Sequence, residues 1–252
     1  MSSTRKQLMW IYKRLHSAYG PRNWWPAETE FEVVVGAILT QQAPWTNVEK
    51  AMANLRERGL LDPELLAKAE TTLVEKLVRP AGFYKVKSRR IIRMAESYGR
   101  IRAAYDMPIN EARKELLSME GIGPETCDSI LLYAGNVPTF VIDAYTKRMA
   151  GRYGLTEDEN ADYHDLKGMF EDGLPRNERL FNEYHALIVE LGKRHCKIKP
   201  ECEGCPLKMR CKKRVAIKPQ KKTAAGKSQK KTATSKSRKK TAANNTKARK
   251  RK

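Results

Sequence analysis

The sequence predicts an all-α protein, and three observations support that fold class. Apolar residues recur at intervals of three and four along most of the chain, as they do on one face of a helix. Alternating runs that would predict strands are scarce, and the best of them, Pro138 to Ile142, is short. At 252 residues the chain is long enough for one large domain or two smaller lobes.

The periodic segments define the expected helices in chain order. Leu8, Ile11, Leu15 and Tyr19 predict a first helix, and Val34 and Ile38 predict a second one after the acidic residues 28–32. The same spacing predicts helices over 46–58, 84–103, 109–118, 124–135, 143–153 and 177–193.

The formal charge of +21 is concentrated at the C-terminal end. Residues 212–252 hold 18 of the 50 Lys and Arg and no Asp or Glu, so the remainder carries 32 bases against 29 acids, about +3. This end repeats KKTA at 221, 230 and 239 without a large apolar residue, which predicts a disordered tail. A nonspecific tether for DNA or RNA is the favoured role, and a solubilising tail is the alternative.

Nothing in the sequence predicts a membrane or secreted protein. No run approaches the roughly 18 apolar residues of a membrane span, and charges interrupt the apolar residues of the N-terminus. Four cysteines crowd into 196–211 while Cys127 stands alone, unlike a secreted disulfide framework. The expectation is an intracellular protein of the cytoplasm or nucleoid, and a monomer.

The stretch MEGIGPETCDSILLYA, residues 119–134, predicts two helices joined by a very tight turn. Gly121-Ile122-Gly123 would form the turn, and Pro124 suits the first position of the second helix. The free amides at that N-terminus, up to Thr126, would form a seat for a phosphate. An ordinary helical hairpin is the alternative.

The four clustered cysteines predict a soft metal centre. Cys196, Cys202, Cys205 and Cys211 are separated by five, two and five residues, a compact loop that could wrap four thiolates around one site. Zinc ribbons usually have two Cys-x2-Cys knuckles. A [4Fe-4S] cluster is therefore favoured, with zinc and plain thiols as alternatives.

The order of these motifs resembles that of the endonuclease III superfamily of DNA glycosylases. The hairpin, Asp143 in VPTFVIDAYTKRM, and the cysteine loop follow one another over about residues 28–211. The resemblance implies two helical lobes, 24–137 and 1–23 plus 138–211, with an active cleft between them. It also implies base excision repair of damaged double-stranded DNA, with chemistry at Asp143.

The same resemblance implies the DNA contacts. Gly121, Ile122, Gly123 and Thr126 of the hairpin would grip phosphates, and Gln42 would fill the gap left by a flipped nucleotide.

Two departures from the family pattern concern the chemistry. Bifunctional members carry a lysine that attacks the sugar, but Glu125 stands at that position here and a carboxylate cannot form the imine. A monofunctional glycosylase is therefore expected, in which Glu125 orients water or shapes the pocket, or simply caps the helix. The first cysteine gap is five residues, where the best-known members have six.

Aromatic residues indicate a branch of the superfamily. Trp24-Trp25-Pro26 and AILTQQAPW, which ends at Trp45, are similar to the lesion pocket of endonuclease-III-like 3-methyladenine DNA glycosylases. An N-alkylated purine is cationic, so electron-rich rings attract it more than a normal base. The alternative is that the tryptophans only plug the join between the lobes.

Several other functions stay open at this point. They are a bifunctional oxidised-pyrimidine glycosylase with lyase activity, a glycosylase for mismatched thymine or uracil or for adenine opposite damaged guanine, and a noncatalytic DNA-binding module. His16, His164, His185 and His195 have no metal-ligand spacing, and no function is assigned to them.

Overall fold

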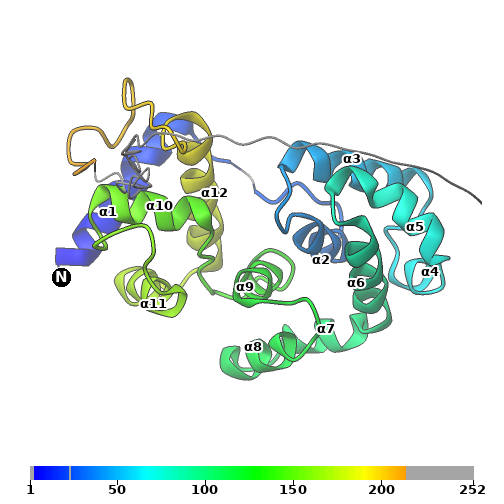
Figure 1. The fold of residues 1–252 in the computed structure, drawn as a ribbon. Coiled ribbons are helices and arrows are strands. Elements are labelled where there is room, and N and C mark those ends of the chain that lie inside the picture. Colours follow the sequence, from blue (N-terminus) through cyan, green and yellow to red (C-terminus); the bar gives the residue numbers. More distant parts are fainter. Residues whose placement is uncertain (1–2, 23, 214–252) are drawn as a thin grey trace, which may run out of the picture. The chain divides into compact units, whose positions relative to one another are not determined.

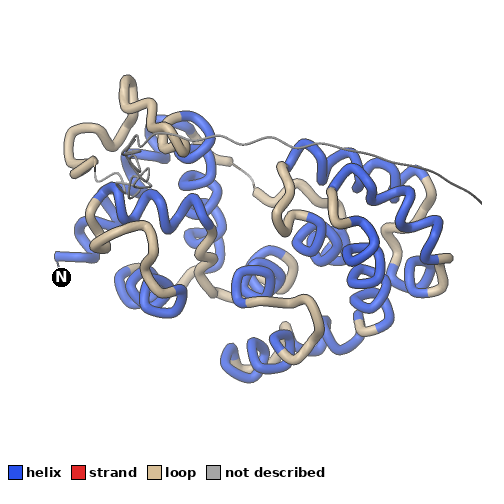
Figure 2. The backbone as a smooth tube through the Cα atoms, in the orientation of Figure 1, coloured by secondary structure: helices blue, strands red, loops and turns tan. Residues whose placement is uncertain are grey.

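The computed structural model describes residues 3–22 and 24–213, which belong to one compact unit. These residues form twelve α-helices and one 3-10 helix, and none of them lies in a strand (Figures 1 and 2). The elements are α1 (Ser3–Tyr19), α2 (Glu30–Leu39), α3 (Trp45–Glu57), α4 (Pro63–Ala67), α5 (Thr71–Val78), η1 (Arg79–Ala81), α6 (Tyr84–Glu96), α7 (Tyr98–Ala104), α8 (Ile109–Leu117), α9 (Pro124–Tyr133), α10 (Ala144–Tyr153), α11 (Tyr163–Gly173) and α12 (Glu178–Arg194).

The all-α prediction is confirmed, and two of its details are wrong. Residues 138–142 are not a strand, because the segment forms a backbone hydrogen bond with a side chain rather than with a neighbouring strand: the Phe140 amide donates to Glu171 Oε1 at 2.8 Å. The helix expected over 84–103 is two helices, since Ser97 leaves the helical conformation at φ −98° and ψ 10°. The short helices α4, α5 and α11 were not predicted.

Two hydrophobic clusters form the core. One gathers buried residues from Phe31 to Val137, and the other combines Leu8, Ile11 and Leu15 of α1 with residues between Leu132 and Leu207. Helix α9 contributes to both clusters and packs against α2, α8 and α12. The hairpin helix therefore lies where the two clusters meet.

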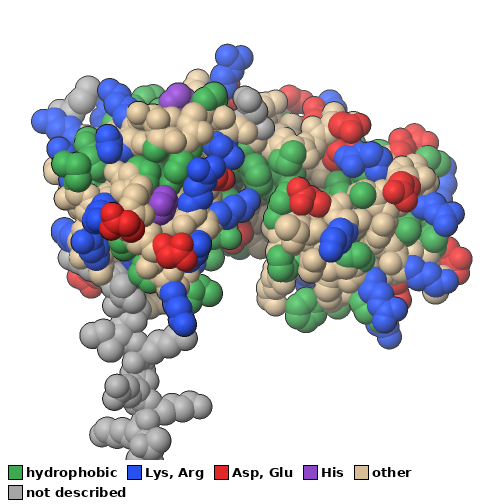
Figure 3. Space-filling model, turned by 90° about the horizontal axis from the view of Figure 1, so that it is seen from above, with side chains coloured by type: hydrophobic (Ala, Val, Ile, Leu, Met, Phe, Trp, Pro, Cys, Tyr) green, Lys and Arg blue, Asp and Glu red, His purple; other side chains and the backbone are tan. Residues whose placement is uncertain are grey.

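Charges on the described surface are mixed. On the face shown in Figure 3, Lys and Arg lie among Asp and Glu. None of the described helices is long and apolar enough to cross a membrane. The predicted tail, 212–252, lies outside the described residues except for Lys212 and Lys213.

A buried carboxylate ties three segments to α9. Asp128 has no exposed side-chain surface and receives Arg113 of α8 in a two-pronged contact, Nε to Oδ1 at 2.8 Å and Nη2 to Oδ2 at 3.2 Å. The Thr139 hydroxyl donates to Oδ1 at 2.9 Å, and the Tyr163 hydroxyl of α11 donates to Oδ2 at 2.8 Å. This network fixes the segment before residue 143 against the hairpin.

We expect Asp128→Ala to lower the free energy of unfolding by about 3–5 kcal/mol, because it removes a fully buried carboxylate and leaves the half-buried Arg113 guanidinium without its counter-charge. Denaturant titration measures this. Glu115→Gln, which breaks the more exposed pair with Arg100, is the control and should change stability by no more than about 1 kcal/mol. Equal stability of the two variants would contradict the structural role of the network.

Candidate active site

One pocket brings together most of the predicted catalytic and base-contacting residues. It is lined by the loop after α2, the start of α9, the N-terminal end of α10 and one side of α12. Asp143, Glu125 and three tryptophans contribute to its wall. The tryptophan segments, the second hairpin helix and the aspartate motif therefore meet in one cavity.

Asp143 is the N-cap of α10. Its Oδ1 accepts from the Thr146 amide at 2.7 Å, and 13% of its side chain is exposed. Burial by itself would raise the pKa of Asp143, but the neighbouring imidazole of His185 and the hydrogen bond from the Thr146 amide outweigh it and lower that pKa. The carboxylate is therefore held ionised inside the pocket.

Glu125 shares the pocket but has the opposite electrostatic setting. It is exposed toward the cavity, in the first turn of α9, and no hydrogen bond from another described residue to its carboxylate offsets its partial desolvation. Desolvation, followed by the negative charge of Asp143, raises the pKa of Glu125 to about 7, although His185 and Lys147 act in the other direction. Two neighbouring carboxyl groups with separated pKa values are a frequent arrangement in acid–base catalysis.

The aromatic wall consists of Trp24, Trp25 and Trp45. Their ring centroids lie 5.2–5.5 Å apart, and Trp25 also lies 5.2 Å from Tyr133. Gly36 makes this packing possible, because a Cβ there would stand 3.2 Å from the Trp25 ring. Pro26, predicted to join the wall, is exposed and does not line the pocket; Pro44 does.

The two turn glycines have different roles. Gly121 has φ +92°, and a Cβ there would meet the Arg90 side chain at 2.7 Å. Gly123 is the N-cap of α9 in extended conformation, and a Cβ there would meet nothing within 4 Å. Positive φ is thus required only at Gly121, while Gly123 leaves the helix N-terminus open to a ligand. Ile122 is buried.

The hairpin and the loop after α2 are hydrogen-bonded through Gln41. Its Nε2 donates to Gly121 O at 2.9 Å and to the Thr126 hydroxyl at 3.0 Å, and its Oε1 accepts from Arg90 Nη1 at 2.8 Å. The Thr126 side chain is buried in this contact, so only its backbone remains for DNA. Gln42, at φ +53°, is exposed beside the pocket.

Two amines lie near the carboxylates. Lys147 Nζ donates to Ala161 O at 2.9 Å, and Lys147 does not line the pocket. Lys193 does line it, with Nζ 5.4 Å from the Trp24 ring centroid. Sequence reasoning counted Lys193 among the basic residues around the cysteine loop and did not place it in this pocket, because nothing in its local spacing distinguishes it from other surface lysines.

Sequence reasoning also assigned no role to His185, which reaches the pocket from α12. Its Nδ1 lies 2.5 Å from the Tyr133 hydroxyl, and its Nε2 lies 3.6 Å from Asp143 Oδ2. The surrounding apolar residues of α12 indicate only that the side chain faces the core.

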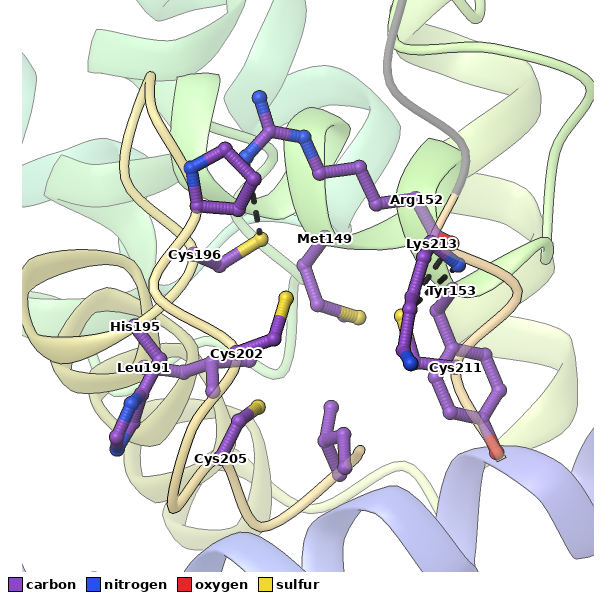
Figure 4. A pocket seen from close by; sticks show the side chains of 12 residues that line it. Met149, Arg152, Tyr153, Leu191, His195, Cys196, Cys202, Cys205, Cys211 and Lys213 are labelled. Carbon is purple, nitrogen blue, oxygen red and sulfur yellow. Dashed lines mark hydrogen bonds between the residues drawn. The ribbon is translucent and has the colours of Figure 1, made fainter. Parts of the chain in front are cut away.

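The four predicted metal ligands line a separate pocket. Cys196, Cys202, Cys205 and Cys211 are free thiols, and Figure 4 shows their sulfur atoms turned toward that shared pocket. Arg152 Nη1 lies 3.8 Å from Cys196 Sγ and would offset negative charge on a thiolate. No group of three or more His, Cys, Asp or Glu among residues 3–22 and 24–213 could hold a metal ion as the side chains stand.

The chain belongs to the HhH-GPD superfamily of base excision DNA repair proteins, whose model matches residues 35–174. The matched span includes the hairpin and Asp143 and ends before the four cysteines. The protein is a DNA repair glycosylase, a hydrolase of N-glycosyl bonds.

Individual relatives agree with this assignment. A segment of 207 residues is 47% identical to a Methanocaldococcus jannaschii protein assigned to the DNA repair glycosylases, covering 80% of this chain and 94% of that one. Endonuclease III homolog 1 of Arabidopsis thaliana is 30% identical over 74% of the chain, which spans only 50% of that longer protein.

Solved structures share the fold. The H. pylori 3-methyladenine DNA glycosylase, bound to 1,N6-ethenoadenine, superposes with a TM-score of 0.65 at 26% identity, over 77% of this chain and 98% of that one. An endonuclease III–DNA complex gives a TM-score of 0.71 at 20% identity, over 84% and 97%. The all-α glycosylase fold is thus confirmed.

The two glycines offer a matched pair of variants. Gly121→Ala should lower the free energy of unfolding by about 1–3 kcal/mol through backbone strain and contact with Arg90. Gly123→Ala should change it by less than about 0.5 kcal/mol, yet weaken binding to duplex DNA roughly tenfold, because the methyl group keeps a phosphate away from the α9 amides. Thermal unfolding and fluorescence anisotropy measure the two effects. Wild-type DNA affinity in Gly123→Ala would show that DNA does not contact the turn.

Proposed function

We propose that the protein is a monofunctional glycosylase that hydrolyses the N-glycosidic bond of a flipped-out alkylated purine, such as 3-methyladenine. The observation that supports this proposal most strongly is the pocket, which is lined by three tryptophans and by two carboxylates, Asp143 and Glu125. Glu125 stands where a bifunctional member would have its lysine. The similarity to a 3-methyladenine glycosylase structure supports the same substrate class.

The pocket favours a cationic base for two physical reasons. Indole rings attract a cation through their negative faces, and the carboxylates attract it by charge. Because Lys193 lies over a face of Trp24, the positive base is expected to stack on Trp25 or Trp45 instead. A normal base is neutral and gains neither attraction, so the pocket itself discriminates between alkylated and normal bases.

DNA is held through its phosphates. The N-terminus of α9 has no side-chain cap, so its first amides beyond Pro124 are available to a phosphate oxygen. Gln42 then enters the duplex at the position of the expelled nucleotide. Ile122, which is buried, supports the turn rather than contacting DNA.

Asp143 stabilises the positive charge that develops on the sugar as the bond to the base breaks. Its lowered pKa makes it a weak base but a permanent anion, which suits electrostatic stabilisation. The bonding electrons leave with the alkylated base, which becomes neutral and therefore needs no proton.

Glu125 receives the proton of the attacking water. A general base works best with a pKa near the operating pH, and the pKa of Glu125 is about 7. The water oxygen bonds to the sugar carbon, and its proton passes to the Glu125 carboxylate, which completes an abasic product without an amine.

The cysteine loop is proposed to hold a [4Fe-4S] cluster rather than zinc. Zinc needs four sulfurs about 2.3 Å from one point, whereas a four-iron cluster bonds each thiolate to a different iron and accepts a wider spread. Cys196, Cys202, Cys205 and Cys211 would be its ligands. Such a group supplies a rigid, charged brace for the loop, and the residues of the lesion pocket carry out the hydrolysis.

A panel of duplexes carrying 3-methyladenine, uracil, mismatched thymine or an oxidised pyrimidine tests the substrate class. We expect release of the alkylated base only.

Asp143→Asn should slow this release by roughly a thousandfold while keeping DNA affinity, because Asn still caps α10. Asp162→Asn is the matched control, since Asp162 caps α11 outside the pocket. Undiminished excision by Asp143→Asn would overturn the assignment.

Borohydride added during turnover separates the monofunctional proposal from the lyase alternative. Without an attacking amine, no covalent protein–DNA adduct should form. An adduct that disappears in Lys193→Ala would instead identify the pocket lysine as a nucleophile.

The role of Glu125 has a pH signature. Single-turnover excision should rise with pH through about 7, because only the ionised carboxylate accepts a proton. In Glu125→Gln the rate should no longer rise with pH through this range, and at pH 8 it should be roughly tenfold to a hundredfold lower than in the wild type. Glu111→Gln, in the first turn of α8, is the control. A rate that falls as pH rises through 7 would mean that Glu125 donates a proton instead.

A further inference from the structure

His185 is a buried side chain that lies between Tyr133 of α9 and Asp143 at the start of α10. Only 7% of its side chain is exposed, and its two ring nitrogens face different partners. Nδ1 lies 2.5 Å from the hydroxyl of Tyr133, the last residue of α9. Nε2 has no hydrogen-bond partner, and the acceptor it faces is Asp143 Oδ2, 3.6 Å away.

The Tyr133 contact determines where the imidazole carries its proton. Desolvation, then the charges of Asp143 and Glu125, raise the pKa of Tyr133 well above its ordinary value, so the phenol keeps its proton. The phenol therefore donates to Nδ1, which acts as acceptor, and the ring proton resides on Nε2. The buried N–H is thus directed at the carboxylate.

We propose that His185 is a positioning residue, oriented by Tyr133, whose Nε2–H donates to Asp143 Oδ2 when the pocket closes on a flipped nucleotide. A shift of about 0.6 Å would bring the pair into hydrogen-bonding range, and such contacts often tighten only in the substrate complex. The Thr146 amide already holds Oδ1. With both oxygens fixed, the carboxylate is locked as an oriented anion beneath the sugar. The catalytic part of this inference rests on the proposed function.

Other charged groups also face this pair. Glu125 of α9 and Lys193 of α12 line the same pocket, and Lys147 of α10 acts on Glu125 through its charge. Among the described residues, none of these three side chains is hydrogen-bonded to the side chain of His185 or Asp143. The Tyr133–His185–Asp143 chain therefore has its own hydrogen-bond signature, which can be tested separately.

The first measurement needs no substrate. In full-length protein labelled with 15N-histidine, the His185 signals, assigned by their loss in His185→Gln, should show the proton on Nε2. Tyr133→Phe should abolish this preference and give a mixture of tautomers. A proton mainly on Nδ1, or spectra unaffected by Tyr133→Phe, would overturn the inference.

The second measurement is single-turnover excision of the alkylated base across pH. We expect His185→Phe to reduce the maximal rate roughly tenfold to a hundredfold with unchanged DNA affinity, and to move the acidic limb of the pH profile to higher pH, because His185 lowers the pKa of both Glu125 and Asp143. His185→Gln, whose amide can place a donor near the Nε2 position, should restore much of the rate. His164→Gln, at an exposed histidine of α11, is the control.

The outcomes separate the two proposals. If the wild-type protein excises no alkylated base, the proposed function fails, while the NMR experiment still decides the inference. If wild type is active and His185→Phe retains the wild-type rate and pH profile, the inference fails and the proposed function stands.

Discussion

The buried carboxylate of Asp128 is the constraint on which the site geometry depends. It lies three residues after Glu125 on α9 and holds Thr139, which lies four residues before Asp143. The positions of the two site carboxylates are thus related through one hydrogen-bonded centre. Arg113 offsets its charge, so the desolvation of Asp128 is balanced by directional contacts. A hydrophobic contact could fill the same volume but would not fix the positions of Arg113 and Thr139 relative to α9.

The two site carboxylates show how local hydrogen bonding decides the behaviour of similar groups. Both lie at helix N-termini, where the helix dipole favours an anion. Asp143 also accepts a direct amide hydrogen bond and faces His185, whereas no such donor holds the Glu125 carboxylate. Because the pKa of Glu125 is about 7 in the folded chain and 4.5 ordinarily, folding takes up a proton there. The contribution of Glu125 to stability therefore decreases as pH rises from about 4.5 to about 7, which indicates a functional rather than a structural reason for this residue.

Sequence reasoning predicted what depends on local pattern and motif order. It identified the helical class, the Gly-Ile-Gly hairpin and the residues Asp143, Glu125 and Trp45 that share the pocket. It did not identify His185 or Lys193, because their roles arise from contacts between α12 and segments more than forty residues away. Its best strand candidate, 138–142, is not a strand: its β-branched and aromatic residues fill a core, and the Phe140 amide is hydrogen-bonded to a side chain of α11. The missed features of the site are long-range contacts, which local periodicity does not encode.

The Gln41 contacts link the hairpin turn to the loop that carries Gln42. Gln41 and Gln42 are adjacent, yet Gln41 is hydrogen-bonded to the hairpin and Gln42 is exposed with a left-handed backbone. The Gly121 carbonyl is thus bonded to the residue that directly precedes Gln42. The Arg90 side chain lies against Gly121 and donates to Gln41, so it belongs to the same group of contacts. A residue with a Cβ at position 121 would disturb both contacts, which explains the glycine there by the coupling of two loops as well as by backbone geometry.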